Sequence, residues 1–257
     1  CPGIIALLIG EKVMTSQSES VRIDPAEDIL RRDLAACYRL VAHFGWDDLV
    51  ATHISVRIPG EDSFLINPFG MLFDEICPAD LVKVDLDGNV LNPTKWKVNK
   101  AGFVIHSAIH RVRHDVVCAI HLHTDDGIAV SVLEDGLLPL QQLAMLLAGD
   151  IAFHEYEGVA FELEERDRLV ADLGDKNLMF LRNHGTLAVG SSVAEAFTLM
   201  YFFEKSCTAQ VRALSMGLPL HPVSDDVIAK VSALRVTDEM SFVEEVLWPA
   251  MLRKLDR

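Results

Sequence analysis

Apolar positions along the first third of the chain change from helical spacing to strand spacing. Asp24 and Glu27 form a capping box around Pro25, which takes the first helical position, so the pattern predicts a helix over 24–44. Apolar residues recur every three or four positions along it, as expected of a helix that buries one face. The segments after it are short and rich in strand-forming residues, and they cover 53–58, 64–66 and 81–91. We therefore expect one helix followed by antiparallel strands.

The rest of the chain alternates strands with helices. The run 116–122 is almost entirely apolar, which predicts a central strand covered on both faces. Strands over 177–181 and 186–189 are expected to pair around the turn at His184. Helical patterns cover 100–113, 125–133, 142–147, 162–173 and 192–216, and two further helices are predicted from Ser224 and from about Asp238. No linker or repeat divides the chain, so we expect a single α/β domain over 24–257.

The N-terminal residues 1–23 are expected to lie outside the folded core. The opening CPGIIALLIG is apolar, but it is much shorter than the ~20 residues of a membrane span and lacks the basic leader of a signal peptide. Met14 begins a polar stretch and is a candidate start, which would make 1–13 an upstream extension. We expect no membrane partner.

Composition narrows the classes of partner. The chain has 257 residues, of which 50% are hydrophobic and 24% charged, as in ordinary globular proteins. Its 38 acidic and 23 basic side chains give a net charge of −15, which repels a phosphate backbone and argues against nucleic acid as a partner. The 5 cysteines are scattered without a C-x-x-C pair, which argues against disulfides and a cysteine zinc site, so we expect a cytoplasmic protein.

The motif H-L-H at 121–123 is the sharpest chemical feature. Residues i and i+2 of a strand face the same side, so His121 and His123 would lie side by side at a strand end. Two partly buried histidines bonded to the backbone are the alternative. His184 stands at a tight turn before Gly185, and together the three imidazoles would make a divalent-metal site with an open position.

A second histidine group lies on the predicted helix 100–113. His106 and His110 are spaced to share one face, and His114 follows four residues later. An H-x-x-x-H pair can bind metal, but arginines adjoin this one and no glutamate of the H-E-x-x-H type is present. We favour a structural role for the group, with His106 nearest the pocket.

Four motifs together resemble the class II aldolase/adducin family. They are T-H-I-S-V-R at 52–57, I-N-P-F-G at 66–70, H-L-H at 121–123 and N-H-G at 183–185. The resemblance spans roughly 24–216, and its most specific part is the H-x-H followed some sixty residues later by N-H-G.

The resemblance implies a fold, an assembly and a site. The fold is a three-layer αβα domain with a mostly antiparallel central sheet, and the assembly is a homotetramer with its sites near subunit boundaries. The mean hydropathy of +0.25 is high for a monomer of this size, which also favours subunit contacts. The metal would sit on His121, His123 and His184. Zinc is the first choice, with manganese, iron and cobalt as alternatives, because three imidazoles suit all four. Substrate-binding candidates from the matching motifs are His53, Ser55, Asn67, Gly70 and Lys100.

Two departures from the family pattern bear on the reaction. In the sugar-phosphate aldolases a glutamate four residues before the position of His106 serves as metal ligand and acid/base, whereas this chain has Gly102. Those enzymes also hold the substrate phosphate with small hydroxylated or amide side chains, where this chain has His53, Phe69 and Ala101. We therefore expect no activity of the ordinary sugar-phosphate type.

The sequence is compatible with two functions. The first is a metal-dependent carbon-carbon lyase, of aldolase or decarboxylase type, acting on a small carbonyl or carboxylate substrate. Lys100 would bind a substrate carboxylate, and His106 or a water activated by the metal would act as base. The second is a non-catalytic, oligomeric binding module like the adducin headpiece, which the stretch N-K-A-G-F at 99–103 resembles. We favour the enzyme because a scaffold has no evident use for an open metal position.

Overall fold

One seven-stranded sheet organises the protein. The computed structural model describes residues 24–158, 165–234 and 240–256. The strands are β1 (His53–Arg57), β2 (Ser63–Ile66), β3 (Val82–Asp85), β4 (Cys118–Leu122), β5 (Ile151–His154), β6 (Leu178–Leu181) and β7 (Gly185–Gly190). Their order is β3-β2-β1-β4-β7-β6-β5, and every neighbouring pair is antiparallel except β5 and β6. The predicted mostly antiparallel sheet is confirmed.

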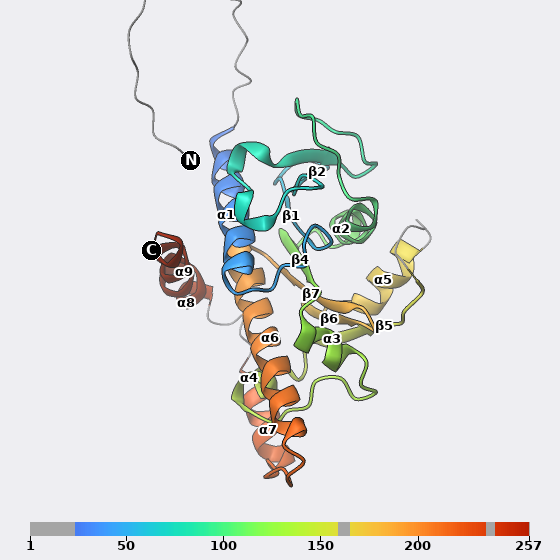
Figure 1. Cartoon of the computed structure of the whole chain (residues 1–257), viewed down its shortest axis with the longest axis vertical. Coiled ribbons are helices and arrows are strands. Elements are labelled where there is room, and N and C mark those ends of the chain that lie inside the picture. Colours follow the sequence, from blue (N-terminus) through green and yellow to red (C-terminus); the bar gives the residue numbers. More distant parts are fainter. Residues whose placement is uncertain (1–23, 159–164, 235–239, 257) are drawn as a thin grey trace, which may run out of the picture.

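Helices cover both faces of this sheet, which makes three layers (Figure 1). On one face lie α1 (Pro25–His43), α3 (Asp125–Ser131), α4 (Gln142–Leu147) and the long α6 (Val193–Ser215). On the other face lie α2 (Lys100–Val112) and α5 (Glu165–Leu173). The smaller elements are η1 (Phe73–Glu75), η2 (Pro78–Asp80), α7 (Asp225–Ser232), α8 (Met240–Phe242), the π-helical turn η4 (Val243–Leu247) and α9 (Trp248–Leu255).

The central strand β4 distributes its residues between the two faces. Cys118, Ile120 and Leu122 belong to the core beneath α1 and α6. Ala119 belongs to the core beneath α2 and α5, and the alternation of a strand puts His121 on that same face. The apolar run that predicted a central strand therefore contains one polar residue, His121. At this position the core beneath α2 and α5 ends and a polar site begins.

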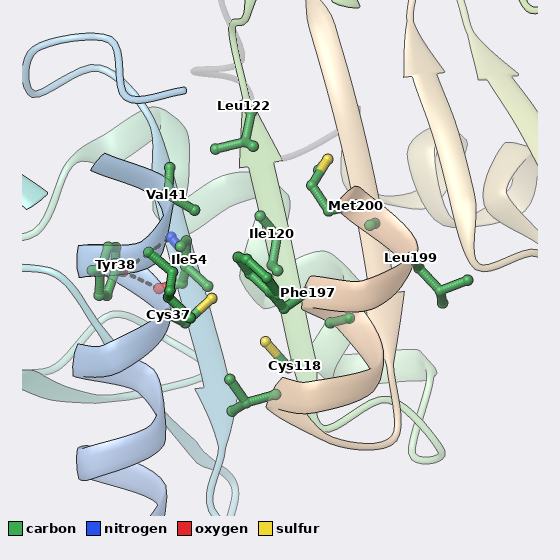
Figure 2. Packing of buried hydrophobic residues seen from close by; sticks show 14 of the residues in the cluster. Cys37, Tyr38, Val41, Ile54, Cys118, Ile120, Leu122, Phe197, Leu199 and Met200 are labelled. Atoms are coloured by element: carbon green, nitrogen blue, oxygen red, sulfur yellow. Dashed lines mark hydrogen bonds between the residues drawn. The ribbon is translucent and has the colours of Figure 1, made fainter. Parts of the chain in front are cut away.

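Packing of α1 against the sheet fixes the start of β1 (Figure 2). The buried Tyr38 hydroxyl accepts the backbone N–H groups of Ile54 and Asn67, each at 3.0 Å. Its own proton faces the Ile54 carbonyl and Asn67 Oδ1. One side chain thus satisfies backbone groups on two segments, and it holds the start of β1, beside His53, against the residue that follows β2.

Most sequence predictions of local structure are confirmed, with some differences. The predicted helices over 100–113, 142–147 and 192–216 match α2, α4 and α6 closely. The edge strand β5 is absent from the sequence prediction because four residues are too short to show a pattern. The predicted extension 1–23 lies outside the described residues, as do 162–164 of one predicted helix and the start near 238 of another, and the single-domain assignment stays a prediction.

No helix within the described residues combines the length and the apolar character that a membrane span requires.

Candidate metal centre and the histidine chain beside it

Three imidazoles converge where β4 ends and β7 begins. His121 belongs to β4, His123 follows the strand by one residue, and His184 directly precedes β7, which pairs with β4. The Nε2 atom of His123 lies 2.9 Å from Nε2 of His121 and 3.0 Å from Nε2 of His184. We call these three residues the histidine cluster. The proximity that H-x-H and N-H-G predicted is present.

Outer partners orient two of these rings. Nδ1 of His121 lies 2.9 Å from the Thr186 carbonyl oxygen, and Nδ1 of His123 lies 3.1 Å from Asp48 Oδ2. A carbonyl and an ionised carboxylate only accept hydrogen bonds, so both Nδ1 atoms carry the proton. The lone pairs of both rings are then on Nε2, which is where the rings meet.

Two of the three imidazoles in the cluster, those of His121 and His184, have lowered pKa values. Burial, followed by the neighbouring imidazoles, lowers the pKa of His121 well below its usual range. Burial and then His123 lower the pKa of His184 to about 4. Neutral imidazoles are the form that binds divalent metals.

The donor set fits a divalent cation. Two unprotonated Nε2 atoms held 2.9 Å apart repel one another unless a cation or proton lies between them. Three nitrogen ligands with carbonyl and carboxylate partners behind them are the usual composition of a zinc-type site with an open position. Among the described residues, the cluster is the one group of histidine, cysteine or acidic side chains close enough to hold a metal ion.

A buried carboxylate on α6 supports the cluster from behind. Glu204 is 2% exposed, and it accepts the hydroxyls of Thr124 and Thr186, the latter at 2.6 Å. These threonines stand within two residues of His123 and His184 in sequence. Burial is the main cause that raises the Glu204 pKa to about 7, and the two threonine hydroxyls act against it. Glu204 therefore ties the two ligand-bearing segments to one helix.

His53, the first residue of β1, lies beside the His121 residue of the cluster on the neighbouring strand β4. It pairs with His121 in the β1–β4 register, and the two ring centroids are 5.0 Å apart. A Cβ atom on Gly102 would stand 2.6 Å from His53 Cδ2 and 2.8 Å from its Cγ. The His53 ring therefore occupies the space that any side chain at position 102 would need.

A line of hydrogen bonds runs from His53 into the interior between β1 and α2. Nδ1 of His53 lies 2.8 Å from Nε2 of His106, and Nδ1 of His106 lies 2.5 Å from Ser55 Oγ. The same Oγ lies 2.7 Å from Nε2 of His110. All four residues are buried, and we call them the histidine chain. His106, the base candidate, thus lies behind His53 rather than beside the cluster.

The remaining candidates divide between interior and surface. Ser55 is committed to the histidine chain, and Asn67 contacts Tyr38 with its amide oxygen, so neither side chain is directed at the cluster by these contacts. Gly70 is exposed, with a φ of 102° that only glycine adopts easily. Lys100 is exposed at the first turn of α2, two residues before Gly102.

Sequence reasoning missed the residues that orient the ligands. Asp48 stands 75 positions before His123, and Glu204 stands 80 positions after Thr124. Neither belongs to a motif, and Thr186 acts on His121 through its backbone carbonyl. No signal in the sequence could have found these contacts, because they arise only when β4, β7, α6 and the segment before β1 are packed together.

Comparison with known proteins identifies relatives across most of the chain. A "Putative aldolase class 2 protein" of Caulobacter vibrioides is 48% identical over 250 residues, which covers 97% of each chain. Alpha-adducin of Mus musculus is 43% identical over 202 residues, which covers 77% of this chain and 27% of the adducin.

Solved structures of similar fold also come from aldolases and their relatives. An aldolase II superfamily protein from Pseudomonas syringae has a TM-score of 0.86 and 48% identity, covering 92% of this chain and 95% of that one. An L-fuculose 1-phosphate aldolase from Glaciozyma antarctica has a TM-score of 0.77 and 30% identity, covering 88% and 89%. Residues 32–211 match the family described as Class II Aldolase and Adducin N-terminal domain. The chain belongs to the class II aldolase and adducin family.

Proposed function

We propose that the protein is a divalent-metal-dependent lyase, of aldolase or decarboxylase type, that acts on a small carbonyl or carboxylate compound. The observation that supports this most is the convergence of three Nε2 atoms, two of them fixed as lone-pair donors by Thr186 and Asp48. A bound metal would supply Lewis-acid polarisation of a substrate oxygen. The metal ligands in this proposal are His121, His123 and His184, and zinc is the proposed ion.

Lys100 is the proposed anion-binding residue. It stands at the first turn of α2, where the backbone N–H groups also favour negative charge, and the His53 ring packs against the backbone two residues further on. Its ammonium group would pair with a substrate carboxylate as a point charge. Substrate contacts at Ser55, Asn67 and Gly70 stay predictions, and so does His106 as base.

We do not expect turnover of sugar phosphates of the fuculose type. A general base is worth about a hundredfold to ten-thousandfold in rate, and Gly102 offers none. A glutamate could not be added there without moving His53, because the site of its Cβ is already filled. Robust cleavage of L-fuculose 1-phosphate, the substrate named for the Glaciozyma relative, would contradict this part of the proposal.

The proposed assembly is a homotetramer in the cytoplasm. Exposed apolar side chains such as Phe69 and Leu72, 45% and 41% accessible, would be covered in subunit contacts. None of the four cysteines among the described residues forms a disulfide, which suits a reducing compartment. Light scattering at micromolar concentration tests the assembly, and a stable monomer mass would contradict it.

The experiment is a substrate screen on the zinc-loaded chain. Small carboxylates and carbonyl compounds are incubated with the protein, and release of carbon dioxide or of an aldehyde is followed. An active compound should lose turnover in His184→Ala. In Lys100→Met its KM should rise roughly 10- to 100-fold, the value of a charge-assisted contact, while the exposed neighbour Lys97→Met changes little. Turnover that survives in His184→Ala would contradict the assignment.

The adducin relatives support a second candidate, a non-catalytic oligomeric binding module. The similarity to alpha-adducin covers 77% of this chain. In this case the histidine cluster would be a structural metal site, and no compound of the screen would turn over although metal binds.

A further inference from the structure

The histidine chain has ends of different character. At one end the His53 ring lies against His121 of the cluster, with ring centroids 5.0 Å apart. At the other end His110 Nδ1 is buried without a hydrogen-bond partner among the described residues. Between them every link is a direct contact of 2.5 to 2.8 Å. Because the contacts are continuous, the ring nitrogen that carries the proton in one histidine determines which nitrogen carries it in the next.

Only two arrangements of protons satisfy all the links. His106 and His110 are neutral near pH 7, because burial lowers both pKa values to about 3. A neutral imidazole has one N–H and one lone pair, and a hydroxyl has one proton to donate. Each inner imidazole must therefore donate to one neighbour and accept from the other. Ser55 must do the same, because accepting from both histidines would leave its own buried proton without an acceptor among the described residues. Either all donate towards His110, or all donate towards His53.

Arg57 decides between the two arrangements. It is the last residue of β1, two positions after Ser55 on the same strand face, and it is 8% exposed. Its Nε and Nη2 atoms are buried without a hydrogen-bond partner among the described residues, as His110 Nδ1 is. A guanidinium has donors only and keeps its charge, so its positive charge favours a lone pair rather than a proton on the buried Nδ1 of His110. After burial, the charge of Arg57 is the cause that lowers the His110 pKa.

The consequence passes along the histidine chain one contact at a time. With its lone pair on Nδ1, His110 carries the proton on Nε2 and donates it to Ser55 Oγ. Ser55 then donates to Nδ1 of His106, and His106 donates from Nε2 to Nδ1 of His53. His53 is left with its proton on Nε2.

We propose that Arg57, acting through the histidine chain, fixes His53 as the Nε2–H tautomer, so that His53 donates a hydrogen bond to a substrate oxygen beside the histidine cluster. The substrate part of this inference rests on the proposed function. The oxygen is one that bears negative charge, a carboxylate or a carbonyl oxygen becoming an oxyanion, because a fixed neutral donor stabilises such charge. In this form His53 has no free lone pair, so it is a hydrogen-bond donor and not the base.

The test is a direct observation of the tautomers. Solid-state ¹⁵N NMR of the uniformly ¹³C,¹⁵N-labelled full chain distinguishes protonated from unprotonated ring nitrogens, and carbon correlations assign them to residues. We expect protonated Nε2 and unprotonated Nδ1 at His53, His106 and His110, both after removal of metal with a chelator and after addition of zinc. Protonated Nδ1 at His53 or His106 would overturn the proposal.

Substitutions of Arg57 and Ser55 test which residues fix the tautomers of the histidine chain. Arg57→Met should produce a second tautomer at all three histidines, whereas Arg57→Lys should keep one. Ser55→Ala should produce a second tautomer at His106 and His53 but leave His110 unchanged, because the charge of Arg57 still acts on His110. Ser107→Ala is the matched control, since Ser107 is also fully buried but bonds only to carbonyls of its own helix.

The pattern of responses separates this proposal from the proposed function. If Ser55→Ala leaves His53 in a single tautomer, the histidine chain does not set its proton and the proposal fails, even if Arg57→Met does not fold. A protein that binds no metal but shows the expected tautomers would contradict the proposed function and leave the role of Arg57 intact. With an active compound in hand, His53→Phe should lower kcat, with rescue by His53→Gln, which keeps a donor.

Discussion

Lone pairs point at one another in the histidine cluster, whereas in the histidine chain each inner nitrogen meets a group that can take the opposite hydrogen-bonding role. The two sets meet on the side of the sheet that α2 and α5 cover, where His53 and His121 are paired across neighbouring strands. In the proposed function a cation completes the histidine cluster, whereas the histidine chain is complete among protein atoms except at its ends. Identical side chains thus gain different chemistry from their partners, Thr186 and Asp48 in one case and Ser55 in the other.

The largest expected effect is acid unfolding driven by the histidine chain. The folded pKa values of His106 and His110 are lowered to about 3, so their stabilisation is present above the unfolded value of 6.5 and is lost as pH falls from there towards 3. The loss amounts to several kcal/mol. Urea denaturation in chelator between pH 7 and pH 4 measures it.

A matched pair of variants checks the assignment of that slope. His106→Gln combined with His110→Gln should flatten it, and His221→Gln, on the exposed surface, should leave it unchanged. An unchanged slope in the double variant would mean that the acid sensitivity belongs to the cluster instead.

Glu204 should show the opposite pH dependence. Its folded pKa is raised from 4.5 to about 7, so its contribution to stability is present below pH 4.5 and is lost as pH rises through 7. Glu204→Gln should therefore gain stability relative to the unmodified chain, by about 3 kcal/mol, as pH increases from 4.5 to 8. Thermal or urea denaturation at the two pH values decides this, and a difference that does not change with pH would show that Glu204 is not buried as a carboxylate.

Gly102→Ala tests whether His53 fills the space beside position 102. The added Cβ would overlap the His53 ring, so we expect a net loss of about 1 to 2 kcal/mol, since overpacking costs more than the helix gains from alanine. The loss should disappear when His53→Ser is added. Gly149→Ala, where a Cβ meets nothing within 4 Å, is the control. Equal losses in the presence and absence of the His53 ring would refute the steric account.

The smallest expected effect comes from the outer partner of His123. Asp48→Asn should weaken zinc binding about tenfold, because the amide orients the imidazole less strongly than the carboxylate does. Asp47→Asn, at the exposed neighbouring position, should leave the affinity unchanged. Competition with a chromogenic chelator measures both, and identical affinities in the two variants would remove Asp48 from the site.

The sequence predicted what short-range patterns can carry. Capping residues placed α1 and α6, and the apolar run placed β4 in the centre of the sheet. The H-x-H and N-H-G motifs brought together the three residues of the cluster. Each of these depends on neighbours within a few positions, or on a resemblance that conveys the fold.

Contacts between distant segments were beyond the reach of the sequence. The hydrogen bond from His123 to Asp48 and the overlap between position 102 and His53 depend on how strands and helices pack. The helical spacing of His106 and His110 correctly placed them on one helix face, but only the position of Ser55 on β1 shows that they form a line. Partners of this kind require the three-dimensional fold.

Metal analysis of the purified protein tests the central claim most directly. The full chain is supplied with zinc, freed of excess by gel filtration, and measured by mass spectrometry beside His123→Ala and His110→Gln. We predict about one zinc per chain in the unmodified protein and in His110→Gln, and none in His123→Ala, because only the cluster directs lone pairs at a common point. No zinc in the unmodified protein, or zinc retained by His123→Ala, would contradict the account.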